Sequence, residues 1–127
     1  MTESKPPDRS IVLCIDDETI GLKLRSKVLE LEGYAVLQAS SGAEGLELFR
    51  KINPDLVVMD QSMPGMSGEE VAEQIRRMNP KTPLILHSAS VDVSRESRSL
   101  FNAFVPKGEN SNLLRQMQHL LSVVGKC

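Results

Sequence analysis

Five short apolar runs alternate along the chain with longer segments of helical periodicity, and this alternation constrains the fold more than any other feature. The runs lie at residues 11–15, 34–39, 55–59, 83–88 and 103–106. Each is too short for a buried helix and is bounded by charged or turn-forming residues, which is typical of strands buried in a parallel sheet. The pattern therefore predicts an α/β domain in which helices cover both faces of a five-stranded parallel sheet.

The segments between and after these runs predict five helices, at residues 18–33, 40–55, 67–80, 90–103 and 110–124. In the first, the residues at helical spacing that we expect to face the sheet are Ile20, Leu24, Val28 and Leu31. The corresponding residues of the second are Leu46, Phe49 and Ile52, and those of the last are Leu113, Leu114, Met117, Leu120, Leu121 and Val124. Ser67 is expected to cap the third helix.

Length and composition indicate one soluble domain. The chain has 127 residues, of which 40% are hydrophobic and 25% charged, so it can bury a core of ordinary size. We expect residues 1–9 to form a flexible lead-in and residues 10–125 to form the domain. No apolar run approaches the roughly 18 residues of a membrane span, which favours a cytoplasmic protein without membrane contact. The net charge of -2 and 3% aromatic content argue against direct nucleic-acid binding.

Polar side chains follow all five apolar runs, with Ser40 and Ser41 after the second, and those after the other four carry charges or a further hydroxyl. They are Asp16, Asp17 and Glu18 after the first run, Asp60 after the third, Ser88 after the fourth and Lys107 after the fifth. Ligands of parallel sheets bind beyond the carboxyl ends of the strands, so these residues mark the edge where a site is expected. Clustered carboxylates suit Mg²⁺, whereas the absence of grouped Cys and His residues at these positions argues against zinc.

A carboxylate held beside Mg²⁺ can attack a phosphoryl group and form an acyl phosphate, while an ammonium and a hydroxyl stabilise the phosphoryl oxygens. Each residue also has a structural interpretation. Asp16 or Asp17 could cap the next helix, and Asp60 could begin a turn. Ser88 could end a strand, and Lys107 could be a solvated surface charge. Their coincidence at one sheet edge favours the chemical interpretation.

These residues occur in motifs that resemble the receiver domains of two-component response regulators. The motifs are the pair Asp16-Asp17, the block DQSMPGMSG at 60–68, the pair Ser88-Ala89 and the run FVPK at 104–107. The resemblance covers about residues 10–125. It implies a flavodoxin-like, doubly wound sheet with strand order 2-1-3-4-5 and five helices on two faces.

The resemblance also implies a role for individual residues. Asp60 would be the phosphoacceptor, Ser88 the switch hydroxyl, Lys107 the phosphate-pairing lysine and Phe104 the switch aromatic. The Mg²⁺ ligands would be the carboxylates of Asp16, Asp17 and Asp60 and the backbone carbonyl of Ser62.

As a receiver, the chain would take a phosphoryl group from the phosphohistidine of a histidine kinase or phosphotransfer protein. Phosphorylation would change the surface formed by the fourth helix, fifth strand and fifth helix. That surface would bind a downstream protein or an output domain absent from this chain. A receiver has no separate turnover substrate, so we do not expect an enzyme in the usual sense.

Three alternatives use the same fold. A protein-binding pseudo-receiver without phosphorylation is suggested by Gly108, because the family usually has proline after the lysine. An aspartyl-phosphate phosphatase is disfavoured because Ser62 stands where such enzymes place a second aspartate. A flavin carrier is disfavoured because an acidic pocket repels a phosphate group.

Overall fold

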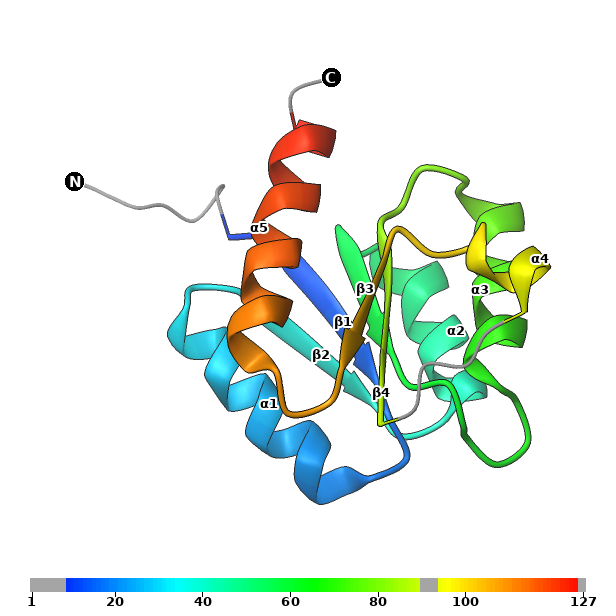
Figure 1. Cartoon of the computed structure of the whole chain (residues 1–127), viewed down its shortest axis with the longest axis horizontal. Helices are drawn as coiled ribbons and strands as arrows, with labels where there is room; N and C mark the ends of the chain where they lie inside the picture. Colours follow the sequence, from blue (N-terminus) through cyan, green and yellow to red (C-terminus); the bar gives the residue numbers. More distant parts are fainter. Residues whose placement is uncertain (1–8, 90–93, 126–127) are drawn as a thin grey trace.

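The strands form a single parallel sheet with helices on both faces. The structure, a computed structural model, describes residues 9–89 and 94–125. The strands are β1 (Ile11–Ile15), β2 (Ala35–Ala39), β3 (Leu56–Met59), β4 (Leu84–Ser88) and β5 (Ala103–Pro106). They pair in the order β2-β1-β3-β4-β5, all parallel (Figure 1). The predicted fold class and strand order are confirmed.

The helices are α1 (Thr19–Leu31), α2 (Gly42–Ile52), α3 (Gly68–Met78), α4 (Arg95–Arg98) and α5 (Asn110–Gly125). Helices α1 and α5 cover one face of the sheet, and α2 and α3 cover the other, with the short α4 beside α3 (Figure 1). In the part of the chain that the structure describes, no helix combines the length and apolarity that crossing a bilayer would require.

The core is divided between these two faces because side chains alternate along each strand. Leu13 and Ile15 of β1 point into a cluster with residues of α2 and α3. Val12 and Cys14 of the same strand point into a second cluster with residues of α1 and α5. All four are buried, which explains why the strand has a continuous apolar sequence.

Local sequence signals determine where α2 and α3 begin. The Ser41 side chain accepts a hydrogen bond from the Glu44 N–H at the start of α2. Ser67 accepts from the Glu70 N–H, and the Glu70 carboxylate accepts from the Ser67 N–H, forming a capping box at α3. The cap predicted at Ser67 is confirmed. These caps orient α2 and α3 beside the carboxyl edge of the sheet.

The predicted inward face of α1 is wrong. Ile20, Leu24 and Leu31 are 77%, 66% and 78% exposed. The buried residues of α1 are instead Leu22, Arg25, Ser26 and Leu29. Two of these are polar, so a search for apolar periodicity assigns their positions to solvent and selects the opposite stripe. The Ser26 hydroxyl donates to the Leu22 carbonyl at 2.7 Å, which allows it to be buried.

Two other helical predictions need correction or lie outside the described residues. Leu46 and Phe49 of α2 are buried as predicted, but Ile52 in its last turn is 43% exposed. The helix predicted over 90–103 is only the single turn Arg95–Arg98 among the residues described there, and residues 90–93 are not described. In α5, Leu113 and Met117 are buried as predicted, whereas the side chain of Val124 lies outside the description.

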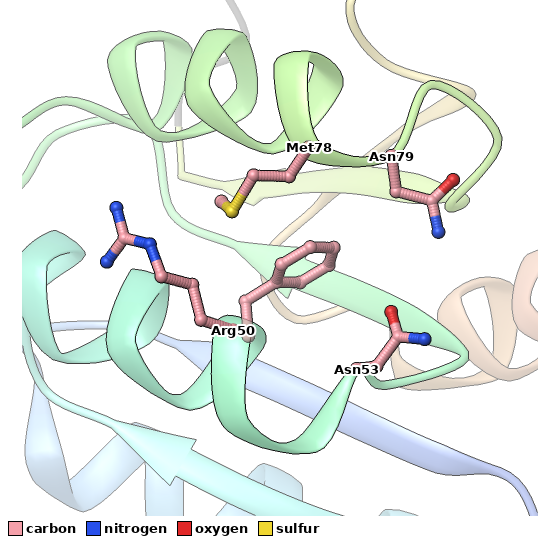
Figure 2. Close-up of a pocket in the computed structure, with 5 residues that line it drawn as sticks. Arg50, Asn53, Met78 and Asn79 are labelled. Carbon is pink, nitrogen blue, oxygen red and sulfur yellow. The ribbon is translucent and has the colours of Figure 1, made fainter.

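The amino edge of the sheet lies opposite the end where the polar strand-end residues gather. A shallow pocket opens there between the last turns of α2 and α3 (Figure 2). Its lining residues are Phe49, Arg50, Asn53, Met78 and Asn79. Its lining contains no carboxylate and none of the candidate site residues predicted from the sequence, which instead follow the strands at the carboxyl edge.

Candidate functional site at the carboxyl edge of the sheet

Backbone hydrogen bonds extend the sheet by one residue at three strand ends. The N–H of Asp16 donates to the carbonyl of Ala39, the last residue of β2, at 3.0 Å. In the same way Asp60 donates to Ile15 of β1, and Lys107 donates to Ser88 of β4, each at 3.0 Å. Three of the residues singled out from the sequence are therefore positioned by the sheet rather than by mobile loops.

The three aspartates predicted as metal ligands lie together. Asp16, Asp17 and Asp60 each offer a carboxylate oxygen, and these oxygens lie within 4.8 Å of one another. Asp16 and Asp60 are buried at 1% and 7% exposure, and Asp17 is the most exposed of the three. Like charges this close, two of them removed from water, repel unless a cation or a proton compensates them.

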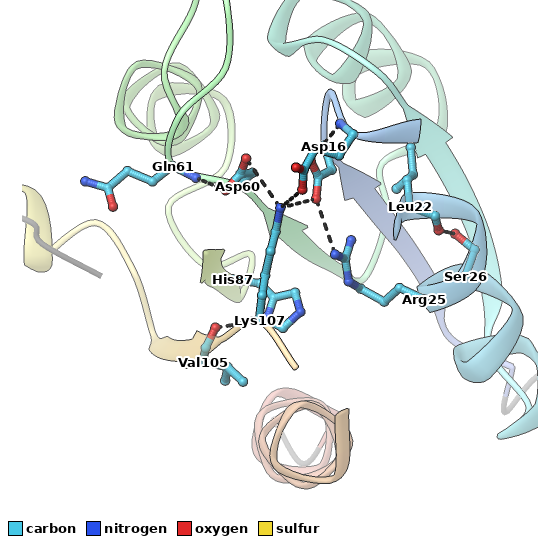
Figure 3. Close-up of polar contacts among 10 residues, drawn as sticks. Asp16, Leu22, Arg25, Ser26, Asp60, Gln61, His87, Val105 and Lys107 are labelled. Carbon is cyan, nitrogen blue, oxygen red and sulfur yellow. Dashed lines mark hydrogen bonds and ion pairs between the residues drawn. The ribbon is translucent and has the colours of Figure 1, made fainter. Parts of the chain in front are cut away.

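The ammonium of Lys107 lies among these carboxylates (Figure 3). Its Nζ is 2.8 Å from Asp16 Oδ2, 2.9 Å from Glu18 Oε1 and 3.6 Å from Asp60 Oδ2. Lys107 thus links Asp16 and Glu18, which follow β1, to Asp60, which follows β3. Gly108, which follows it where the family usually has proline, does not remove Lys107 from the cluster.

The protein environment disfavours the ionised form of Asp60. Burial raises the pKa of Asp60, and the Asp16 carboxylate adds to this effect, while Lys107 and a hydrogen bond from the Ser88 side chain oppose it. The Gln61 N–H also donates to Asp60 Oδ1 at 2.9 Å. The net result is a pKa above the ordinary value, so the free site gains from any cation that compensates the Asp60 carboxylate.

Asp16 behaves in the opposite way. Burial acts to raise the pKa of Asp16, but the hydrogen bonds from Lys107 and from the Glu18 N–H, together with the nearby charges of Lys107 and Arg25, lower it below the ordinary value. Burial likewise acts to lower the pKa of Lys107, but its bonds to Asp16 and Glu18 raise it overall. The Asp16 carboxylate and the Lys107 ammonium therefore form a stable ion pair.

The loop after Asp60 packs against the backbone of Asp60 itself. The Gly68 N–H donates to the Gln61 carbonyl at 2.9 Å, closing the loop at the start of α3. A Cβ at Gly68 would overlap the Asp60 carbonyl oxygen, so the close approach requires glycine. Ser62, whose carbonyl was predicted as a metal ligand, lies in this loop and is exposed.

Ser88 and Phe104 occupy different positions relative to the acidic cluster. Ser88 is buried and hydrogen-bonded to Asp60, next to the carboxylates. Phe104 of β5 contacts the region of α4 instead: the Arg98 guanidinium carbon lies 5.5 Å from its ring centroid, and the Phe101 ring is edge-on at 5.8 Å. Phe104 is therefore placed where a change in its rotamer would alter the α4 and β5 surface.

Two buried side chains beside the cluster were missed. Arg25 of α1 donates from a guanidinium NH₂ to Asp16 Oδ2 at 3.3 Å (Figure 3). The second is His87 of β4, whose Nδ1 lies 2.9 Å from the Val105 carbonyl. The available signal for Arg25 was its position between Leu22 and Leu29, each separated from it by about one helical turn.

The donor set fits Mg²⁺. The clustered groups are carboxylates, the hard oxygen ligands that Mg²⁺ prefers, and no thiolate or imidazole belongs to any metal-like cluster among the described residues. Asp17 is open enough to leave room for the water ligands that Mg²⁺ retains. Together the residues can hold a divalent cation and present the Asp60 carboxylate beside an ammonium and a hydroxyl.

A comparison with known protein families gives the identity of this arrangement. Residues 12–118 match the model of the response regulator receiver domain. The chain belongs to this family. The match includes every strand and the whole acidic edge, so the receiver domain accounts for both the fold and the clustered carboxylates.

Individual relatives agree with the family assignment. The receiver is 41% identical over 83 residues to the transcriptional regulatory protein AfsQ1 of Streptomyces coelicolor, covering 65% of this chain and 36% of that protein. It is 33% identical to sporulation initiation phosphotransferase F of Bacillus subtilis, covering 70% of this chain and 73% of that protein. The chain thus spans about a third of the length of the regulator and most of the phosphotransferase.

Solved structures show the same fold. Response regulator TrrA from Thermotoga maritima, in complex with Mg(2+)-BeF, has a TM-score of 0.81 and 34% identity, covering 88% of this chain and 98% of that one. A CheY-like receiver domain protein from Methanospirillum hungatei has a TM-score of 0.85 and 26% identity, covering 94% and 98%. No separate enzyme family is indicated by the matches to this receiver domain.

Proposed function

We propose that this receiver domain, spanning residues 10–125, accepts a phosphoryl group on Asp60 from the phosphohistidine of a histidine kinase or phosphotransfer protein. The observation that carries the proposal is the convergence of Asp60, Lys107 and Ser88 at one edge, with Lys107 Nζ 3.6 Å from Asp60 Oδ2 and the Ser88 side chain bonded to Asp60. A nucleophile, a cation and a donor are thus adjacent before any phosphoryl group arrives.

The residues that would hold Mg²⁺ are Asp16, Asp17, Asp60 and the Ser62 carbonyl. When bound, the metal supplies positive charge that neutralises phosphoryl oxygens and the carboxylate cluster. A carboxylate oxygen of Asp60 would attack the phosphorus of the phosphohistidine, forming an acyl phosphate as the P–N bond breaks and the donor imidazole leaves. Lys107 moves its ammonium from the carboxylates toward a phosphoryl oxygen, and the Ser88 hydroxyl donates to another.

The output would arise at the side of the sheet that carries Phe104. When the Ser88 hydroxyl turns from the Asp60 carboxylate to the phosphoryl group bound there, it would make space for the Phe104 ring. Phe104 then leaves the guanidinium of Arg98 and the ring of Phe101, changing the surface of α4, β5 and α5. A downstream protein, or an output domain in a longer chain, would bind that surface. We expect no direct nucleic-acid contact, which a net charge of -2 disfavours.

Phosphorylation can be tested by mass spectrometry after incubation with Mg²⁺ and acetyl phosphate. Wild-type protein should gain the mass of one phosphoryl group, and Asp60→Asn should not. The matched control is Asp55→Asn, which removes a carboxylate at the other end of β3, where Asp55 accepts a hydrogen bond from the Ile11 N–H. Asp55→Asn should still be phosphorylated.

The outcome separates the proposal from its alternative. An unmodified wild-type chain, or a modification that persists in Asp60→Asn, would contradict phosphorylation at Asp60. The first of these results would leave a receiver that acts only as a protein-binding module. A pull-down with a phosphotransfer protein, with and without Mg²⁺ and beryllofluoride, would then identify whether partner binding depends on the state of the site.

A further inference from the structure

Arg25 is a buried cation whose interactions differ from those of an ordinary surface arginine. Its side chain is 9% exposed and lies on the buried face of α1, on the side of the sheet that α1 and α5 cover. Among the described residues, Asp16 is the only carboxylate with which Arg25 pairs, through one contact of 3.3 Å. A buried guanidinium with a single anionic partner depends on that partner to remain buried.

The other groups near Arg25 cannot replace Asp16. Burial raises the pKa of Cys14 to about 12, so its thiol is neutral. Burial, with a further contribution from the Arg25 charge, lowers the pKa of His87 to about 4, so its imidazole is also neutral at pH 7. The ion pair with Asp16 is therefore the contact through which Arg25 reaches the acidic edge.

The Asp16 carboxylate is contacted by two cations and one backbone N–H. Its Oδ2 accepts from Lys107 at 2.8 Å and from Arg25 at 3.3 Å, while its Oδ1 accepts from the Glu18 N–H at 3.0 Å. Lys107 is the nearer and more exposed of the two cations, with 18% side-chain exposure against 9%. Lys107 can thus leave Asp16 toward a new anion, whereas Arg25 lies on a packed helix.

We propose that Arg25 is a positioning residue that remains paired with Asp16 and thereby allows Lys107 to leave Asp16 for the incoming phosphoryl group. The proposal rests on the phosphoacceptor function proposed above. Without Arg25, the departure of Lys107 would remove both protein cations from a carboxylate that is 1% exposed, and a Mg²⁺ shared with Asp17 and Asp60 would be its remaining cationic partner. Loss of compensation at a buried charge is unfavourable, so Lys107 would be held more tightly at Asp16.

The exchange of partners can be tested without metal or phosphate. Urea unfolding in EDTA would compare wild type, Arg25→Met, Lys107→Met and the double variant. The fall in the unfolding midpoint caused by Arg25→Met should be at least about twofold larger in the Lys107→Met background, because Arg25 is then the remaining cation on Asp16. Equal falls in the two backgrounds would overturn the proposal.

Two further variants control for charge and packing. Lys23→Met removes a positive charge from the exposed side of the same helix and should have the same small effect in both backgrounds. Arg25→Lys keeps a cation at the position and should recover most of the loss in the Lys107→Met background. Failure of the double variant to fold, when both single variants fold, is the extreme form of the expected non-additivity and supports the proposal.

The second readout is the rate of phosphorylation by acetyl phosphate with Mg²⁺. Arg25→Met should lower the rate at saturating donor about tenfold and leave the half-saturating donor concentration unchanged, while Arg25→Lys restores the rate. A rate equal to wild type in Arg25→Met would overturn the proposal. If wild-type protein is not phosphorylated at all, the proposed function fails. The urea comparison still decides whether Arg25 becomes the main cationic partner of Asp16 when Lys107 is removed.

Discussion

The two edges of the sheet each hold an arginine, and the two arginines are bonded in contrasting ways. At the carboxyl edge, Arg25 makes one contact with a charged group that Lys107 also contacts. At the amino edge, Arg76 of α3 donates only to neutral oxygens among residues 9–89 and 94–125. Its acceptors are the carbonyls of Leu100, Pro80 and Thr82 and the side-chain oxygen of Asn102, at 3.1, 3.2, 2.6 and 2.9 Å.

The difference separates a structural site from a functional one. The Arg76 hydrogen bonds join the end of α3 to the segments before β4 and β5. Their acceptors are uncharged and belong to packed segments, so nothing in the arrangement favours an exchange of partners. At the carboxyl edge, Lys107 pairs with three carboxylates and Asp16 with two cations, and these groups raise and lower one another's pKa. Charges satisfied by fixed dipoles stabilise a fold, whereas charges that share partners can exchange them.

The largest effect on stability is expected from Arg76→Met. It removes four hydrogen bonds and leaves partly buried carbonyls without a donor, which should lower the free energy of unfolding by about 3 to 4 kcal/mol. Arg77→Met, an exposed neighbour on α3, should cost far less. Urea unfolding measures both. Arg76→Met should still be phosphorylated on Asp60, and its failure to be phosphorylated while folded would contradict the separation of the two edges.

The next effect concerns pH and His87 at the carboxyl edge. The pKa of His87 is lowered by burial from 6.5 to about 4, so the unfolded chain binds a proton that the folded chain does not. Stability present above pH 6.5 is therefore lost as the pH falls toward 4, by up to about 3 kcal/mol. His87→Gln should lack this loss. Unfolding midpoints of both proteins across this range would show it, and parallel curves would contradict the expectation.

A smaller effect is expected from Gly68→Ala at the loop that supports Asp60. Because its Cβ would overlap the Asp60 carbonyl oxygen, the loop must shift, at a cost of about 2 kcal/mol. Gly21→Ala in α1 is the matched control. A Cβ there has no atom within 4 Å, so the substitution should stabilise the protein by about 0.5 to 1 kcal/mol. Equal effects of the two substitutions would show that the Gly68 contact is unimportant.

The smallest expected effect comes from the charge of Asp60, and its dependence on pH is opposite in sign to that of His87. The raised pKa of Asp60 means that its ionisation disfavours the folded state, so this part of the stability is lost as pH rises through the folded pKa. Asp60→Asn should therefore have a slightly higher urea midpoint than wild type at pH 7 in EDTA. The difference should narrow as pH falls toward the ordinary aspartate value of 3.8. A lower midpoint for Asp60→Asn at pH 7 would contradict this.

Much of the fold could be predicted because its signals are local. Continuous apolar runs mark strands buried on both faces, and Ser67 with Glu70 marks the start of α3. The inward face of α1 could not be predicted in this way. Arg25 occupies a buried position because it meets Asp16, nine residues away in sequence, and no local pattern contains that contact.

The site was predictable to the extent that strand ends converge in any parallel sheet. That rule is sufficient to bring Asp16, Asp60 and Lys107 to one edge. It does not reveal which groups pair, because pairing depends on side chains that come from helices. The Arg76 contacts were not predicted, because three of the four acceptors are backbone carbonyls, which any sequence could supply.

The hydrogen bond between the Lys107 N–H and the Ser88 carbonyl has a mechanical consequence. Ser88 pairs in register with Pro106, and in a parallel ladder the next residue, Lys107, is the donor to the Ser88 carbonyl. The backbones of Ser88 and Lys107 are therefore tethered, and a displacement of one strand end pulls the other with it. The strand ends that carry the Ser88 hydroxyl and the Lys107 ammonium would therefore approach a bound group together rather than independently.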